Sequence, residues 1–545
     1  MKKSILQIFK ETISKMIKNN NNNSTSKMEN KQETLQTMKF SRDLDKNIHI
    51  LQSYLGGSDD LLIRYLEIST VPGIRAAVVF IETLINQNTL ESSVLAPLTQ
   101  GLGQRTVEER VYLHSHIDTL IERMLSNSSI FPIHQVKDAV EEILSGKGIL
   151  LIHKYPTALS LSISKDAARE YAEPQTEKVV KGPQQGFVED IATNISILRK
   201  KIKSPNLVVK ELKLGRETRS EIRVAYINHI ADPSIVEEVF RRLKRIDVDG
   251  VIGSSVIEEY ISDAPTSLFQ TTLYTERPDR TQAMLLEGRI AILYDGSPFI
   301  IIVPAIVSDF FNGIEDYYQV PSFANFCRFI GYLGGFVLTF LPSIYIAITT
   351  FHQEMLPTAL ALTIAGARAG VPFPAFVEAL IMELAFEALR QAGTRLPTHI
   401  GQAVSIVGAL IIGQAAVEAG LVSSAVVIVV AITAIFSFTM PYSNFSLSLR
   451  LVRFFMMALA ATLGIYGIMT GALLVALHLI SLRSFGVPFM IPFAPLSLQE
   501  MKDWVMRFPQ WAITERSPHI AKENMKRKSK KLKPKPLKDE ERREL

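Results

Sequence analysis

Ionisable side chains occupy residues 371–397, although this segment lies in a strongly apolar part of the chain. No Asp or Lys occurs between Asp316 and Lys502, so the neighbouring stretches carry few charges. A charged group at the centre of a bilayer costs at least about 2.5 kcal/mol, so such groups usually face protein or a water-filled cavity. The chemistry expected here is ion pairing or the passage of ions. The charged residues of the segment are Glu378, Glu383, Glu387, Arg390 and Arg395.

A helix through this segment would place three of these side chains on one face. At about 100° per residue, Glu383, Glu387 and Arg390 fall within about 60° of one another, whereas Glu378 lies on the opposite side. Glu387 and Arg390 also have the i, i+3 spacing of a helical ion pair. Three arrangements remain open: a helix lying in the membrane interface, an ion-paired helix buried in a bundle, and a helix lining an aqueous path. In the last arrangement, Glu383, Glu387 and Arg390 are the candidate ion pathway.

The elements around this segment are apolar stretches, each long enough to cross about 30 Å of hydrocarbon. Four stretches are clear, and the charged segment or residues 355–370 could add to them, so we expect four to six crossings. The four stretches are residues 329–350, 400–419, 422–440 and 452–480. The second stretch has a small residue at every fourth position, which forms a ridge that lets another helix approach closely. The candidate helix-packing residues are Gly401, Ser405, Ala409 and Gly413.

The N-terminal half contains an internal repeat of strand patterns. Residues 61–81 and residues 207–227 both show an alternating strand, a turn, and a second strand that opens with Ile-Arg. Downstream, residues 144–163 and 285–303 both place a glycine before a two-strand hairpin pattern. In the later copy, Asp-Gly-Ser-Pro at residues 295–298 divides two β-branched runs, which predicts a hairpin and excludes a membrane span there. The repeat predicts two related α/β subdomains.

The predicted fold class is therefore a soluble α/β N-terminal region with two related subdomains, followed by an all-α multi-pass transmembrane domain. Asn19–Asn23 and the polar residues that follow them cannot bury enough surface to become ordered. Residues 521–545 hold eleven Lys or Arg and five Asp or Glu, which gives this tail a net charge of +6. The net charge of +5 of the whole chain therefore comes from the tail. Such a tail is either solvated or attracted to anionic lipid. The predicted boundaries are a disordered polar segment at 1–44, subdomains at 45–182 and 183–320, a transmembrane domain at 321–496, and a basic C-terminal tail at 497–545.

The sequence offers little catalytic chemistry. It has no phosphate-binding glycine motif and no Cys/His cluster, and no nucleophile, base and orienting group are recognisable together. His114 and His116 are too few and too divergent on a helix to predict a metal site. Cys327 is the only cysteine, so no intrachain disulfide is possible. Aromatic residues are not interleaved with the basic tail, which argues against nucleic-acid binding. We expect no enzyme activity, no cofactor, no metal and no nucleic-acid partner.

Long motifs in both halves resemble the A subunit of the GerA-type spore germination receptors. The similarity runs from about residue 45 to residue 496. The motifs are GFVEDIATNISILRKKI (186–202), TERPDRTQAMLLEGRIAILYDGSPF (275–299), EDYY (315–318), FHQEMLPTALALTIAGARAGVPFPAFVEAL (351–380), LRQAGTRLPTHIGQAVSIVGALIIGQAAVEAGLVS (389–423) and SFGVP (484–488).

The resemblance implies an integral membrane subunit that works with a transporter-like B subunit, which binds the nutrient, and a lipoprotein C subunit. It implies a location in the spore inner membrane among membrane lipid, with the soluble region on the cytoplasmic or core side. It also implies a homo-oligomer that transduces nutrient binding into germination by opening an ion channel. The alternative is a non-conducting scaffold or signal-transmitting subunit, in which the charges of residues 371–397 only pair internally.

Overall fold

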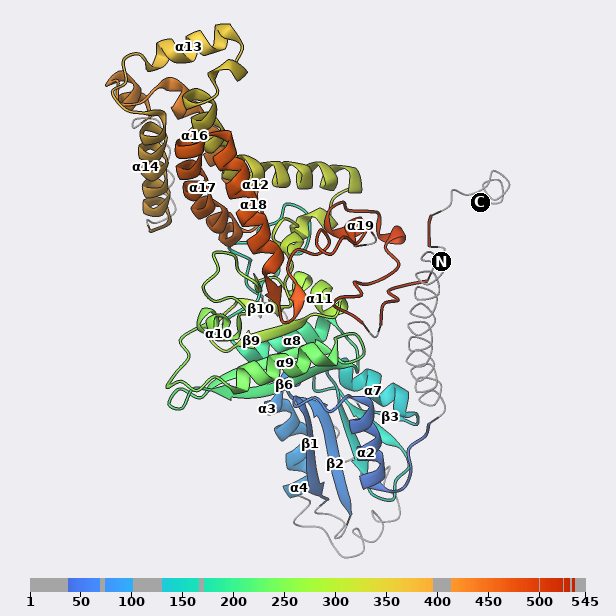
Figure 1. Ribbon diagram of the computed structural model, residues 1–545. Coiled ribbons are helices and arrows are strands. Elements are labelled where there is room, and N and C mark those ends of the chain that lie inside the picture. The colour runs from blue at the N-terminus through green and yellow to red at the C-terminus, as the bar shows by residue number, and fades with distance from the viewer. Residues whose placement is uncertain are drawn as a thin grey trace, which may run out of the picture.

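The computed structural model describes residues 38–68, 74–100, 130–165, 171–395, 413–498, 500–522, 524–529 and 532–534. Figure 1 shows two α/β units in contact with each other and a group of helices beyond the second unit. We call the described residues up to 165 unit 1 and residues 171–320 unit 2. The helical domain comprises the described part of residues 321–481, and the C-terminal segment comprises the described residues that follow it.

Unit 1 is a five-stranded antiparallel sheet with the strand order β1-β2-β4-β5-β3. Its strands are β1 (Leu61–Glu67), β2 (Arg75–Ile81), β3 (Ile130–Ile133), β4 (Gly148–Ile152) and β5 (Ala158–Leu161). Its α-helices are α2 (Leu44–Tyr54), α3 (Gln87–Leu90), α4 (Ala96–Gln100) and α7 (Val136–Leu144). Successive side chains of a strand point to opposite faces, so Val79 packs with α2 and α7 while Val78 packs with α3 and α4. The sheet is therefore covered on both faces.

Unit 2 repeats this arrangement with the strand order β6-β7-β9-β10-β8. Its strands are β6 (Leu207–Leu214), β7 (Ser220–Ile227), β8 (Leu273–Thr275), β9 (Ile290–Tyr294) and β10 (Ile300–Val303). Its α-helices are α8 (Ile191–Lys201), α9 (Pro233–Lys244), α10 (Ser254–Ile261) and α11 (Pro278–Leu286). Each strand occupies the same place as its counterpart in unit 1, so the predicted repeat is confirmed. The predicted hairpin is also present, because β9 pairs with β10 and Gly296 takes a φ of +89° in the turn between them.

A buried ion pair joins the two units. The guanidinium of Arg199 on α8 donates to both carboxylate oxygens of Asp60 at 2.8 and 2.9 Å and to the hydroxyl of Ser58 at 2.8 Å. Ser58 in turn receives a hydrogen bond from the backbone N–H of Val209 on β6 at 2.8 Å. The start of β1 is thereby fixed against the first strand of unit 2.

The helical domain contains two helices that are long and apolar enough to cross a membrane, α12 (Pro321–Thr350) and α17 (Ser443–Leu463). Two further apolar helices, α16 (Ser424–Ser437) and α18 (Ile465–Ser481), are shorter. The helices α13 (Thr358–Arg368) and α14 (Ala375–Arg395) lie between α12 and α16 in the chain. Gly464, with a φ of +61°, separates α17 from α18. The single span expected at 452–480 is therefore two helices, because hydropathy does not reveal a left-handed residue.

The C-terminal segment returns to unit 2. It forms the two-stranded β11 (Arg483–Ser484) and β12 (Val487–Pro488), followed by α19 (Met501–Trp504). Ile520 and Ala521 are fully buried in the two cores of unit 2, and Lys522 pairs with Asp232 at 2.5 Å. The region expected to be a tail from residue 497 is thus packed as far as residue 522, because apolar residues among its charges complete the core.

Candidate functional site

The charged segment folds as α14, which Figure 1 shows beside α16 and α17. Its sequence is rich in Ala, Leu and Glu, which are strong helix formers, and the helix starts just after Pro374. Apolar side chains of α14 pack with α16 and α17, among them Ala379 and Met382. This packing aims the polar face of α14 at α17.

Glu383 of α14 forms an ion pair with Arg453 of α17. The Glu383 Oε2 lies 2.8 Å from Arg453 Nη1, and the two side chains are 0% and 2% exposed. The guanidinium also lies 5.2 Å from the centre of the Phe454 ring. Charges removed from water to this extent are stable only when they are paired, so the two helices depend on each other here.

Glu387, one turn further along α14, contacts two arginines. It pairs with Arg390 of its own helix and with Arg450 of α17, whose Nη1 lies 3.4 Å from Glu387 Oε2. The Glu387 side chain is 26% exposed, so this end of the group reaches solvent or lipid. Glu383, Glu387, Arg390, Arg450 and Arg453 form one group, which we call the α14–α17 charge cluster. The structure therefore brings together the three residues predicted as an ion pathway and adds two arginines.

Glu378 lies apart from this cluster, as its angular position on the helix predicts. Its carboxylate is fully buried, lies 3.2 Å from Arg368 Nε of α13, and accepts a hydrogen bond of 3.0 Å from the backbone N–H of Ser423. Ser423 immediately precedes α16. Glu378 thus holds α13, α14 and the start of α16 together.

The predicted packing ridge is only partly visible. Gly401, Ser405 and Ala409 lie outside the described residues. A Cβ at Gly413 would lie 3.5 Å from Val427 of α16, which is ordinary van der Waals contact. Closer packing occurs at Gly471, where a Cβ would lie 2.5 Å from the sulfur of Met456, so the absence of a side chain there lets α18 approach α17.

A second charged group lies where unit 2 meets the helical domain. Tyr442, in the connection between α16 and α17, donates its hydroxyl hydrogen to Glu177 Oε1 at 2.8 Å. Its ring centre lies 4.4 Å from the guanidinium carbon of Arg280 on α11, and Arg280 lies 3.4 Å from Glu177. Arg280 also donates to the backbone carbonyl oxygens of Asp309 and Asn312, at 3.0 and 3.2 Å. We call Glu177, Arg280 and Tyr442 the junction triad.

Further buried ion pairs surround the junction triad. Arg289 pairs with Asp309, Arg328 with Asp316 at 2.8 Å, and Arg277 with Asp279 at 2.8 Å. Most of these residues come from the motifs at 275–299 and 315–318. The sequence contained a signal for them, since charged residues cluster next to the apolar β9. The sequence does not show which of these residues pair, because pairing depends on how the connections after β10 fold back on unit 2 and α12.

A cavity of about 390 Å³ adjoins the junction triad, with Glu258 and Tyr274 in its wall. Burial of the Glu258 carboxyl raises its pKa above the ordinary value of 4.5, and the hydroxyl groups of Thr272 and Tyr274, which donate to it, only partly oppose this rise. Among the described residues, no three His, Cys, Asp or Glu side chains gather as metal ligands.

Comparison with known proteins extends across both halves of the chain. The family model described as Bacillus/Clostridium GerA spore germination protein matches residues 49–519. Spore germination protein KA of Bacillus subtilis (strain 168) is 42% identical over 505 residues, covering 93% of this chain and 92% of that protein. Spore germination protein GerLA of Bacillus cereus is 34% identical over 470 residues, covering 86% of this chain and 94% of that protein. The crystal structure of the N-terminal domain of the A subunit of the Bacillus megaterium spore germinant receptor GerK3 aligns with a TM-score of 0.39 and 28% identity, covering 49% of this chain and 97% of that one.

Proposed function

The chain belongs to the GerA family of spore germination proteins, and from this we propose that it is the A subunit of a nutrient-responsive germinant receptor. The observation that carries the proposal is the extent of the match, which includes both α/β units and the helical domain. In the proposed complex, a transporter-like B subunit binds the nutrient and a lipoprotein C subunit completes the assembly. The complex resides in the spore inner membrane, with the α/β units on the core side.

In this proposal the junction triad transmits the signal. A movement of unit 2 reaches α17 through Tyr442, because the tyrosine hydroxyl and ring contact Glu177 and Arg280 at once. Buried polar groups cannot lose such partners without a large energetic penalty, so the helices must follow the α/β unit. The α14–α17 charge cluster is then the part of the helical domain that responds.

The proposed output is the opening of an ion path between several copies of the subunit. The support for this step is chemical: Glu383 and Glu387 are carboxylates that attract cations, and Glu387 is partly exposed on a helix face. In the closed state the arginines of the cluster neutralise them. Separation of α14 from α17 would free the carboxylates for a passing cation.

Spores that carry Glu383→Gln together with Glu387→Gln test the ion path. Because Gln keeps the shape and removes the negative charge, we expect slower nutrient-triggered cation release. Release is compared only in spores whose receptor complex still assembles, because Glu383→Gln leaves the buried Arg453 without its partner. The exposed Glu354, in the same domain, provides the matched control variant Glu354→Gln, which should release cations at the wild-type rate. Unchanged release from the double variant would remove both carboxylates from the path.

A non-conducting scaffold or signal-transmitting subunit is the second candidate. The observation in its favour is that Glu378, Glu383 and Glu387 are each paired with arginine inside one chain. Reconstitution of the purified chain in planar bilayers, with and without its partner subunits, distinguishes the two candidates. Conductance that depends on nutrient supports the channel, and silence under every gating condition supports the scaffold.

A further inference from the structure

The first three turns of α12 have two very different faces. Phe323, Phe326, Phe329 and Leu333 recur at every third or fourth position and are between 38% and 64% exposed. Side chains at such spacing share one side of a helix. This side carries no charged residue, so it forms an apolar ridge that faces away from the described parts of the chain.

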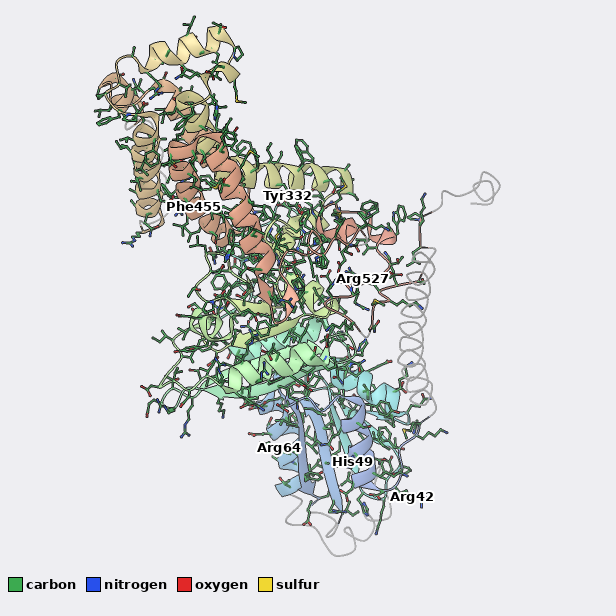
Figure 2. The ribbon with its side chains drawn as sticks, in the orientation of Figure 1. Arg42, His49, Arg64, Tyr332, Phe455 and Arg527 are labelled. Atoms are coloured by element: carbon green, nitrogen blue, oxygen red, sulfur yellow. The ribbon has the colours of Figure 1, made fainter. Side chains whose placement is uncertain are left out.

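The opposite face of the same turns is polar and is fixed to the rest of the protein. Arg328 donates to Asp316 at 2.8 Å. Asn325 exchanges two hydrogen bonds with the backbone of Arg507, at 2.7 and 3.1 Å. Tyr332 donates to the carbonyl oxygen of Trp504 at 3.1 Å, and Figure 2 shows Tyr332 on the part of α12 that projects over the C-terminal segment. The polar face therefore points towards α19 and unit 2.

The length of α12 separates these turns from the part that enters hydrocarbon. Its 30 residues extend about 45 Å, whereas the hydrocarbon layer is about 30 Å thick. About ten residues therefore exceed the layer if the helix lies along the membrane normal. Gly334, Gly335 and Pro342 follow the first three turns, and such residues let a helix change direction.

The C-terminal segment, which is bonded to Asn325 through the backbone of Arg507, also has exposed apolar side chains near these turns. Met506 and Phe508, on either side of Arg507, are exposed, as is Trp511. Lys533 lies 5.4 Å from the Trp511 ring centre, so a cation accompanies the aromatic group. Aromatic side chains with nearby basic groups are typical of the boundary between lipid headgroups and acyl chains.

We infer that residues 321–333 of α12 form an interfacial helix that lies on a phospholipid surface, with the phenylalanine ridge among the upper acyl segments. The inference rests on the proposed membrane location of the helical domain. Lipid is the occupant because the ridge continues directly into the apolar half of α12, and because the opposite face is already occupied by polar contacts. The helix would hold unit 2 against the membrane surface.

Spin labelling of the full chain in vesicles of phosphatidylethanolamine and phosphatidylglycerol tests this. Cys327 is the only cysteine and is exposed at the side of the ridge, so one nitroxide can be attached without any substitution. In a Cys327→Ser background, Phe326→Cys, Phe329→Cys and Leu333→Cys sample the ridge itself, and Phe455→Cys on α17 is the control inside the bilayer. Collision rates with oxygen and with a water-soluble nickel chelate give the depth of each label.

An interfacial helix predicts equal depths at Phe326, Phe329 and Leu333, about 5 to 10 Å below the headgroups. A spanning helix would instead change depth by about 10 Å over these residues, at about 1.5 Å per residue, and would overturn the inference. Protection of the ridge from both reagents would also overturn it, since a second copy of the chain would then cover the phenylalanines. A Phe455 label outside the bilayer would contradict the proposed membrane location as well.

Discussion

Arg453 and Glu383 have almost no contact with solvent, so each depends on the charge of the other. Replacing one partner of a buried pair leaves the other charge uncompensated, which costs about 3 to 5 kcal/mol. We expect Arg453→Met to lower the free energy of unfolding by this amount. Denaturant titration of the purified chain in detergent measures it.

The matched control for this prediction is Arg483→Met, because Arg483 is exposed in β11. It should change the free energy of unfolding by less than about 1 kcal/mol. The double variant Glu383→Gln with Arg453→Met should recover most of the loss, since neither residue then leaves a charge behind. Equal destabilisation by the single and double variants would mean that packing, and not charge, makes the contact.

Glu258 gives unit 2 a predictable dependence on pH. Because burial raises the pKa of this carboxyl above 4.5, the folded state holds the proton more tightly than the unfolded state. The stability that this provides is complete below pH 4.5 and is lost as the pH rises through the folded pKa. The Gln side chain of the variant Glu258→Gln does not ionise, so the variant keeps this stability at high pH. The Tm of the variant minus the Tm of wild type should therefore rise between pH 4 and pH 8.

Thermal unfolding across this pH range checks the prediction, with Glu259→Gln as the control because Glu259 is exposed on the same helix. The Tm difference of the control should not vary with pH. A flat difference for Glu258→Gln as well would show that the carboxyl is not protonated preferentially in the folded state.

For single residues, the sequence predicts which side chains share one face of a helix, but it does not predict which side chains pair between helices. The grouping of Glu383, Glu387 and Arg390 follows from helical periodicity alone. Their partners on α17 depend on how two helices pack, which spacing along one of them cannot show. The same reason explains why the contact of Tyr442 with Glu177 was not expected, since these residues are far apart in the chain. The role of the charge cluster in ion passage stays a prediction.

Among the elements, the junction of α17 and α18 depends on one residue. Gly464 has φ +61° and ψ −137°, a conformation that residues with a side chain rarely adopt. A Cβ there would also lie 3.0 Å from Phe351 and His352. We expect Gly464→Ala to destabilise the helical domain by about 1 to 3 kcal/mol, measured by thermal unfolding in detergent.

Gly366→Ala is the control, because we expect it to change the stability in the opposite direction. Gly366 lies inside α13, and a Cβ at this position would meet nothing within 4 Å. Gly366→Ala should therefore stabilise the protein by up to about 1 kcal/mol through helix propensity. If both variants behaved alike, the backbone conformation of Gly464 would not limit the turn.

Strands and turns of the α/β units were predictable because alternation and turn residues act locally. The hairpin of β9 and β10 is an example, since Asp295 and Gly296 mark its turn. The boundaries of the apolar helices were not predictable in the same way. Hydropathy remains high through Gly464, and it also does not show that α12 begins at Pro321.

For the whole molecule, the C-terminal segment acts as a structural part of unit 2. Ile520 is fully buried beside Ile235, Val239 and Leu243. Ile520→Ala removes buried methyl groups and leaves a cavity, so we expect a loss of about 2 to 4 kcal/mol in the free energy of unfolding. Chemical denaturation followed by tryptophan fluorescence reports it, because Trp504 lies in the same core.

Leu532→Ala is the comparison for this variant, as Leu532 is exposed. It should leave the free energy of unfolding unchanged within about 0.5 kcal/mol. Similar midpoints for Ile520→Ala and wild type would mean that the segment does not pack in solution. The sequence did not predict this packing, because a few apolar residues among many charged ones give no local signal of a core far away in the chain.

The return of the C-terminal segment to unit 2 also restricts the membrane topology that the proposed location allows. At its start, the helical domain is anchored to unit 2 through Arg328 of α12, which donates to Asp316 at 2.8 Å. At its end, Ser484 receives a hydrogen bond of 2.9 Å from Ala305, and Phe485 lies in a core of unit 2. A folded α/β unit lies on one side of a bilayer, so a helical domain that spans the membrane, as we propose, would enter and leave it from that side. Under that proposal the number of crossings is even, which favours four or six over five.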